Sequence, residues 1–104
     1  MSTLNVSALE GKVLDYWMYQ HACEVMENTV SKDEFDKGHA EGMFHFSEDK
    51  ALLSDLMETY TINVQRLAGE WLASTSGQSY YADTPLIAVC RLVIALRYGS
   101  SVTD

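Results

Sequence analysis

Histidines are the residues of this chain with the widest range of chemistry, and two of the three lie close to an acid. His39 and His45 flank Glu41 in a polar stretch. Imidazole and carboxylate groups can bind a transition metal together, so His39, Glu41 and His45 form a conceivable metal site. Their spacing fits no standard metal motif, so we predict no metal site and interpret both histidines as unpaired surface residues. His21 lies near the end of an expected helix, where the helix dipole favours a protonated imidazole.

Asp15 is the acid with the most apolar surroundings, two residues before Trp17. A carboxylate in such surroundings needs a hydrogen-bond donor or a cation. Lys12 is one candidate partner, and Arg91 or Arg97 from the last expected helix is another. We predict structural pairing, with Asp15 and Arg91 as a buried polar pair. The alternative is an acid that lines a ligand pocket beside Trp17.

Motifs for catalysis are absent from the sequence. It contains no glycine-rich phosphate loop, no GxSxG, no HExxH and no CxxC. Cys23 and Cys90 are far apart within apolar helical patterns, which indicates free thiols and a reducing, cytosolic compartment. We therefore predict a protein that is not an enzyme and uses no cofactor.

The charge of the chain is strongly negative and unevenly distributed. Fifteen acidic residues against seven basic ones give a net charge of −8, which disfavours binding to nucleic acid. Residues 24–58 contain ten of the acids but only three lysines. This segment is either a solvated surface or a face that docks on a basic protein. The residues predicted to contact such a partner are Asp33, Glu34, Asp36, Glu41, Glu48 and Asp49.

Three aromatic residues are the candidates for a second kind of site. Tyr80 and Tyr81 lie in an expected loop just before the last helix, and Trp71 lies in an expected strand. Aromatic side chains are frequent at interfaces and can stack on bases. The free amides at the N-terminus of the following helix could bind an anion such as a nucleotide phosphate.

Helical periodicity and capping signals indicate three helices in a single domain over residues 1–104. The first is predicted at about 8–29 behind a capping box of Ser7 and Glu10, and the second at about 48–59 behind Ser47. The third, at about 84–98, follows Asp83 as N-cap and Pro85 in its first turn. It is apolar around most of its circumference, so it should be the central element, or part of its surface should form a homodimer interface.

Alternating residues between the second and third helices predict a β-hairpin at about 61–75, with Ala68 and Gly69 as the turn. The competing interpretation is one continuous helix through 48–74. Residues 31–42 and 76–81 have the composition of loops. The expected fold class is therefore α+β, with three helices and one short hairpin.

Targeting and membrane signals are not expected here. The N-terminus resembles no signal peptide, and the longest apolar run, residues 92–96, is far shorter than the roughly 20 residues of a membrane span. These features predict a cytoplasmic protein without a membrane partner.

Two segments resemble the NinX family of small phage proteins. Leu9-Glu-Gly-Lys-Val-Leu-Asp-Tyr-Trp17 resembles that family's opening L-x-G-x-x-L-D-Y-W, and Thr84-Pro-Leu-Ile-Ala88, with Arg91 and Tyr98-Gly99, resembles its ending. The segment between them lacks the Trp- and Gly-Pro-containing stretch usual in the family. The resemblance implies a phage or prophage accessory protein without catalytic residues. A ligand site shared with the family would involve Asp15, Tyr16, Trp17, Thr84 and Arg91.

Together these observations predict a protein that acts by binding another protein in the cytoplasm of a bacterial host. The natural target is a basic, nucleic-acid-handling defence complex, which an acidic face would inhibit in the manner of an anti-CRISPR protein or a nuclease inhibitor. The alternative is a small-molecule or nucleotide-binding domain that uses Tyr80, Tyr81 and the N-terminus of the last helix.

Overall fold

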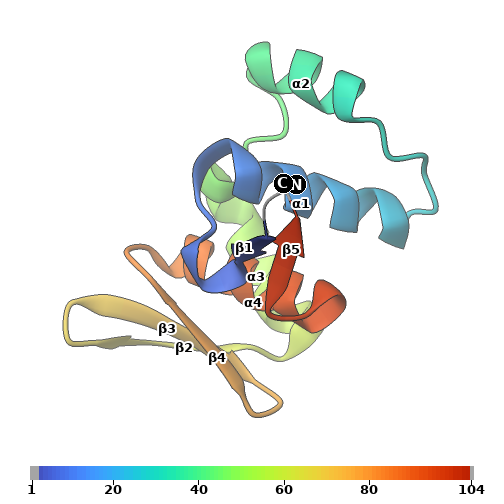
Figure 1. The fold of residues 1–104 in the computed structure, drawn as a ribbon. Coiled ribbons are helices and arrows are strands. Elements are labelled where there is room, and N and C mark those ends of the chain that lie inside the picture. Colours follow the sequence, from blue (N-terminus) through green and yellow to red (C-terminus); the bar gives the residue numbers. More distant parts are fainter. Residues whose placement is uncertain (1–2, 104) are drawn as a thin grey trace.

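Four α-helices and two small antiparallel sheets make up residues 3–103, the part of the chain that the computed structural model describes (Figure 1). The predicted α+β class is confirmed, although one helix and three strands were not expected. In chain order the elements are β1 (Thr3–Asn5), the 3-10 helix η1 (Val6–Ala8), α1 (Gly11–Val25), α2 (Lys32–Ala40), the 3-10 helix η2 (Phe46–Glu48), α3 (Lys50–Tyr60), β2 (Asn63–Leu67), β3 (Glu70–Thr75), β4 (Gln78–Ala82), α4 (Pro85–Tyr98) and β5 (Ser101–Thr103).

The last helix, α4, is the centre of the main core, as predicted. Eight of its residues are buried, and it packs against α1, α3 and the three-stranded sheet. Its N-cap is Thr84 rather than Asp83, since the Thr84 hydroxyl accepts a 3.2 Å hydrogen bond from the Ile87 amide. Pro85 occupies the first turn, as expected. No helix within residues 3–103 is long and apolar enough to cross a membrane.

The predicted hairpin is confirmed, and it is extended by a strand that was expected to be a loop. Strands β2, β3 and β4 form an antiparallel meander in that order. The turn between β2 and β3 includes Gly69, so the continuous helix through 48–74 is wrong. Ser76 and Gly77, both with positive φ, form a tight turn that leads into β4 rather than a longer loop. A second sheet pairs β1 with β5 near the two ends of the chain.

The first helix is shorter than predicted at both ends. It runs from Gly11 to Val25, and the preceding residues form a 3-10 turn whose Val6 is completely buried. The predicted capping box does not form, because Ser7 lies inside that turn and Glu10, at the N-cap, makes no side-chain capping bond. Burial of Val6 and Leu9 in the main core thus determines the path of the chain into α1.

The segment 31–42 contains a helix, α2, where a loop was predicted. Ser31 caps it by accepting a 3.3 Å hydrogen bond from the Glu34 amide, and Asp33 and Glu34 lie in the first turn. Its large buried side chain is Phe35, which is 1% exposed. A single large apolar residue in nine leaves no periodic pattern in the sequence, so the helix was missed.

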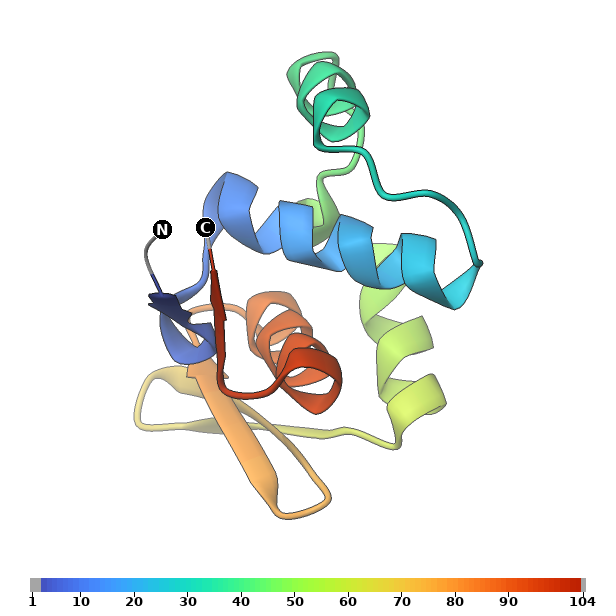
Figure 2. The same ribbon diagram turned by 45° about the vertical axis from the view of Figure 1, so that its right-hand side comes forward.

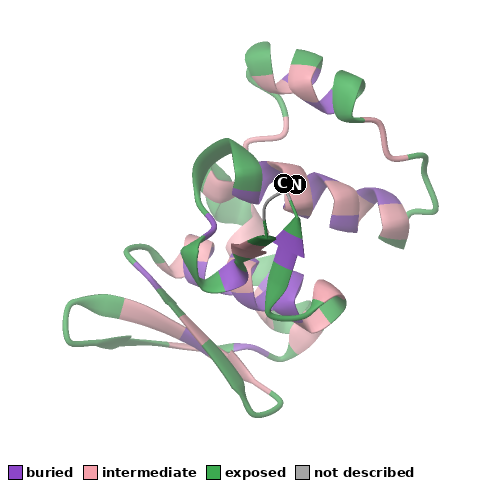
Figure 3. Ribbon diagram, viewed as in Figure 1, coloured by how far each residue is buried: buried purple, intermediate pink, exposed green. Residues whose placement is uncertain are grey.

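A second cluster of buried residues, separate from the main core, lies under α2. Tyr19, Cys23 and Phe35 are buried there, and Tyr16, Val30, Phe44 and Phe46 pack around them. Helix α2 lies on the side of α1 that faces away from the three-stranded sheet (Figures 1 and 2). Its outer surface is exposed, in contrast to the buried α4 (Figure 3). We call this set of seven residues the aromatic cluster.

Both cysteines are free and buried, Cys23 in the aromatic cluster and Cys90 in the main core. Burial raises the pKa of the Cys90 thiol to about 12. The thiol therefore stays protonated and behaves as a small apolar side chain.

Candidate functional site: helix α2 and its base

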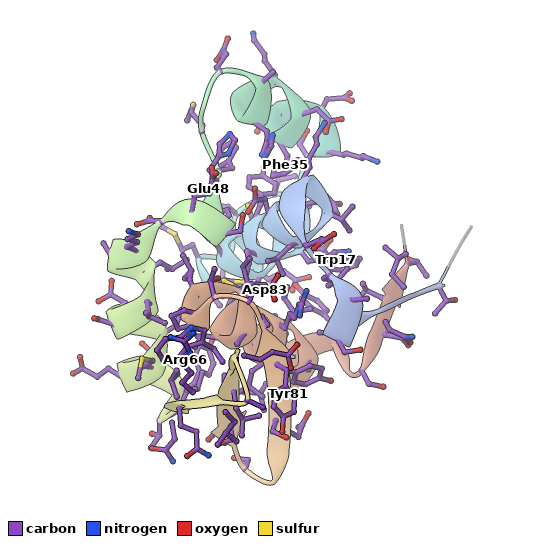
Figure 4. All side chains as sticks on the ribbon, turned by 90° about the vertical axis from the view of Figure 1, so that its left-hand side faces the viewer. Trp17, Phe35, Glu48, Arg66, Tyr81 and Asp83 are labelled. Atoms are coloured by element: carbon purple, nitrogen blue, oxygen red, sulfur yellow. The ribbon has the colours of Figure 1, made fainter. Side chains whose placement is uncertain are left out.

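Aromatic packing holds α2 on the body of the protein. The Phe35 ring centroid lies 5.3 Å from those of Tyr16 and Tyr19, two residues of α1. Phe44, which follows α2, packs on Tyr19 at 4.8 Å. A Cβ atom at Gly38 would overlap the Phe44 ring, so a residue without a side chain lets that ring lie against the helix. Phe35 lies between α2 and α1 in Figure 4.

Polar side chains add a second attachment at the C-terminal end of α2. Asp15 of α1 is only 2% exposed. Its Oδ2 lies 3.0 Å from Nε2 of His39, on the last turn of α2, and its Oδ1 accepts a 2.8 Å hydrogen bond from the Ser47 amide. Asp15 thus has the structural role that was predicted, but its partners are a histidine and a backbone amide. Ser47, expected to cap α3, instead lies in η2, and Asp49 caps α3.

The pair predicted between Asp15 and Arg91 does not form. All three basic residues considered as partners of Asp15 bind other groups. The contacts are Lys12 Nζ with Asp36 Oδ1 at 3.1 Å, Arg97 Nε with Glu24 Oε2 at 2.9 Å, and Arg91 with the backbone carbonyls of Leu9 at 2.8 Å and Tyr81 at 2.6 Å. Arg91 serves to tie the start of α1 and the end of β4 to α4. In the described structure, His39 is therefore the side chain that contacts the Asp15 carboxylate.

His39 and His45 are not the unpaired surface residues that the sequence suggested. Their rings stack with centroids 4.0 Å apart and planes 18° from parallel. His45 Nε2 lies 3.1 Å from the His39 carbonyl oxygen, and its Nδ1 lies 3.1 Å from Glu48 Oε2. We call Asp15, His39, His45 and Glu48 the polar base of α2. Glu48 is at the connection from α2 to α3 (Figure 4).

His21 belongs to a different environment, buried between α1 and α3. The Tyr60 hydroxyl lies 2.7 Å from its Nε2, while its Nδ1 is buried and has no hydrogen-bond partner among the described residues. Burial, reinforced by the positive charge of Arg97, lowers the pKa of His21. The imidazolium expected from the helix dipole is therefore disfavoured, because desolvation outweighs the dipole.

Acidification is expected to destabilise the protein through His21. The unfolded chain binds a proton at an ordinary histidine pKa of about 6.5, whereas folded His21 binds it only at lower pH. The stabilisation is fully present above about pH 6.5 and is lost as the pH falls below it, by at most about 1.4 kcal/mol per pH unit. Urea unfolding between pH 8 and pH 5 measures this slope. It should shrink in a His21→Gln variant, and an unchanged slope in that variant would contradict the assignment.

The six acids predicted to contact a partner divide into two groups. Asp36 is paired with Lys12, Glu48 with His45, and Asp49 caps α3. Asp33, Glu34 and Glu41 have no ion-pair partner among residues 3–103, and all three are exposed. They lie at the two ends of α2, Asp33 and Glu34 in its first turn and Glu41 at its C-cap.

An apolar groove runs beside α2. Its volume is about 450 Å³, and it lies between the C-terminal half of α1 and the segment around Phe44. Met26 on its wall is 71% exposed, and Glu34 lies on its edge. Cys23, Phe44 and Phe46 also line the groove. The groove therefore combines exposed apolar surface with a carboxylate of α2 that has no ion-pair partner in the described part of the chain.

The aromatic residues proposed for a second site lie in the three-stranded sheet. Tyr80 and Tyr81 are in β4, so the predicted loop is absent and their side chains point to opposite faces of the sheet. Tyr80 packs on the main core, while Tyr81 is 47% exposed. Trp71 in β3 is half-buried under the guanidinium of Arg66, 5.8 Å from its ring centroid. Tyr81 and Arg66 lie at the end of the molecule opposite α2 (Figure 4).

Comparison of the chain with protein-family models, with curated proteins and with solved structures finds no match in any of the three. The NinX resemblance therefore stays a prediction.

The sequence did not predict that Asp15, His39 and His45 lie together. Their donor atoms are within 4.8 Å of one another. The three residues come from α1, α2 and the segment after α2, so their spacing carries no motif. The signal that could have found them was Asp15, an acid in apolar surroundings with no assured basic neighbour.

Proposed function

We propose that this protein is a phage or prophage accessory protein that binds a basic host protein through α2 and the groove beside it. The target class is a nucleic-acid-handling defence complex in the host cytoplasm, inhibited in the manner of an anti-CRISPR protein or a nuclease inhibitor. The phage origin follows from the NinX resemblance. The mode of action follows from the surface of α2.

The main observation behind the proposal is that Glu34, an acid without an ion-pair partner among residues 3–103, lies at the edge of an exposed apolar groove. Protein interfaces commonly have an apolar centre with a charged rim. Met26 and Phe44 supply the apolar part, and Asp33 and Glu34 supply the charge. A partner segment that fits would carry an apolar side chain for the groove and lysine or arginine beside it.

The overall charge supports the choice of a basic target. A chain with a net charge of −8 is attracted to surfaces that have evolved to bind a phosphate backbone, and it would compete with nucleic acid for them. Such competition requires no catalytic group. The exposed acids can therefore contribute to inhibition through their charge alone.

Replacing Asp33 with asparagine and Glu34 with glutamine together should slow association with the target by roughly 3–10-fold at low salt. Charges on a binding rim mainly steer the encounter, so the effect should fade at high ionic strength. Purified CRISPR effector complexes and nucleases from the host supply the targets. Association rates by surface plasmon resonance, together with inhibition of target DNA binding, supply the measurement.

The matched control replaces Asp55 with asparagine and Glu58 with glutamine, two exposed acids of α3. It removes the same charge from another surface, so it should change the rate much less. Equal slowing by the two double variants would show a general charge effect and would contradict a contact at α2. Failure of the wild-type protein to inhibit any of these complexes would contradict the proposed target class.

A further inference from the structure

We propose that the polar base of α2 is a binding site for a divalent transition-metal ion of the Zn²⁺ type. Asp15, His39 and His45 would supply one oxygen and two nitrogen ligands, and the Glu48 carboxylate lies beside His45. The proposal is independent of the protein partner, since it concerns binding of the ion by this chain alone.

The donor atoms are already close to a coordinating arrangement. One atom each of Asp15, His39 and His45 lies within 4.8 Å of the others. Ligand atoms on a tetrahedral zinc ion lie about 3–3.5 Å apart, given bond lengths of about 2.0–2.1 Å. The proposal requires the two stacked rings to rotate until their donor atoms reach that separation. The ion would replace the present hydrogen bond between Asp15 and His39.

Neighbouring groups already orient these ligands. The Ser47 amide donates to Asp15 Oδ1, which leaves Oδ2 for the ion. His45 has an acceptor near each ring nitrogen, the His39 carbonyl on one side and Glu48 on the other. One of its nitrogens can thus keep a hydrogen bond while the other binds the ion, as is usual for histidine ligands.

The charge around Asp15 favours a cation. This carboxylate is buried, and the basic side chains considered as its partners, Lys12, Arg91 and Arg97, are engaged elsewhere. A buried carboxylate with no fixed positive charge is costly, and a divalent ion would compensate it. Two flat-stacked imidazoles beside it add nitrogen donors rather than further oxygens.

The donor set also decides which ions fit. Imidazole nitrogen suits zinc, cobalt, nickel and copper, whereas magnesium and calcium require sites made of oxygen. The ligands come from α1, from α2 and from the segment before η2. A bound ion would therefore cross-link α2 to the body at the end opposite Asp33 and Glu34.

The test uses tag-free, full-length protein with Zn²⁺ in calorimetry and Co²⁺ in absorption spectroscopy. We expect one saturable site per chain, the intense visible bands of tetrahedral cobalt, and a Zn²⁺-induced rise in Tm of roughly 5 °C or more. Mg²⁺ should produce neither effect. Absence of saturable Zn²⁺ binding would overturn the proposal.

Two variants locate the site. His45→Gln removes a ligand that is only partly buried, so folding should be kept, and it should weaken Zn²⁺ binding by at least about 10-fold. Glu41→Gln is the control, because Glu41 is exposed and lies outside the donor group. It should bind Zn²⁺ as tightly as the wild type. Equal affinity in His45→Gln and the wild type would place the ion elsewhere and overturn the proposal.

Discussion

Replacing Val93 with aspartate is expected to abolish folding. Val93 is completely buried in α4, within the core that α1, α3 and the three-stranded sheet surround. An unpaired charge at such a position costs several kcal/mol or more, which is comparable to the total stability of about 5–15 kcal/mol typical of a small domain. Far-ultraviolet circular dichroism and thermal unfolding of the purified variant measure the effect.

The matched control is Val25→Asp, because Val25 is 58% exposed at the end of α1. The same substitution there should change stability by about 1 kcal/mol or less. A Val93→Asp protein that unfolds cooperatively near the wild-type temperature would disprove the central place of α4.

Replacing Phe35 with alanine is expected to release α2 while the main core stays folded. Phe35 is the large buried side chain of α2, and it packs in the aromatic cluster rather than in the core around α4. Truncation of a buried phenylalanine typically costs about 3–5 kcal/mol, which exceeds what a helix of nine residues can recover by itself. Hydrogen exchange should show loss of protection in residues 32–40 with that of α4 retained.

The control for this release is Lys37→Ala, an exposed position of the same helix. It should leave exchange in α2 nearly unchanged. If Phe35→Ala accelerated exchange in α4 as much as in α2, the aromatic cluster and the main core would form one cooperative unit. If the released variant still bound the host target at the wild-type rate, α2 would not be the contact.

The protein thus has a tightly packed body and a separately attached helix, α2, which is the proposed binding element. Helix α2 is attached by the aromatic cluster at its inner face and by the polar base at its C-terminal end. Both attachments lie on α1, so changes at either should alter α2 before they alter the sheet. The His39 and Asp15 contact is the attachment that a metal ion would modify.

The parts of the fold that the sequence predicted are those with a strong local pattern. Helix α4 has a nearly continuous apolar sequence with Pro85 at its start, and such a helix must be covered on most of its sides. Strands β2 and β3 alternate on either side of a turn that contains Gly69. The two unpaired cysteines followed from their separation and their apolar neighbours.

Other parts depended on contacts between distant residues, which no local pattern encodes. Helix α2 forms because one residue, Phe35, reaches an aromatic cluster contributed by α1 and by the segment after α2. Strand β4 forms because β3 offers it a free edge, although Gln78–Ala82 alone has the composition of a loop.

The polar site shows the same division between sequence and tertiary structure. The Asp15 side chain was expected to need a partner, because burial of a carboxylate without a donor or a cation is costly. The sequence offered Lys12, which is close along the chain, and Arg91 or Arg97, which are far along it. Their positive charge made these three the expected partners. The fold placed His39 and the Ser47 amide there instead, since the docking of α2 on α1 sets which groups reach the carboxylate.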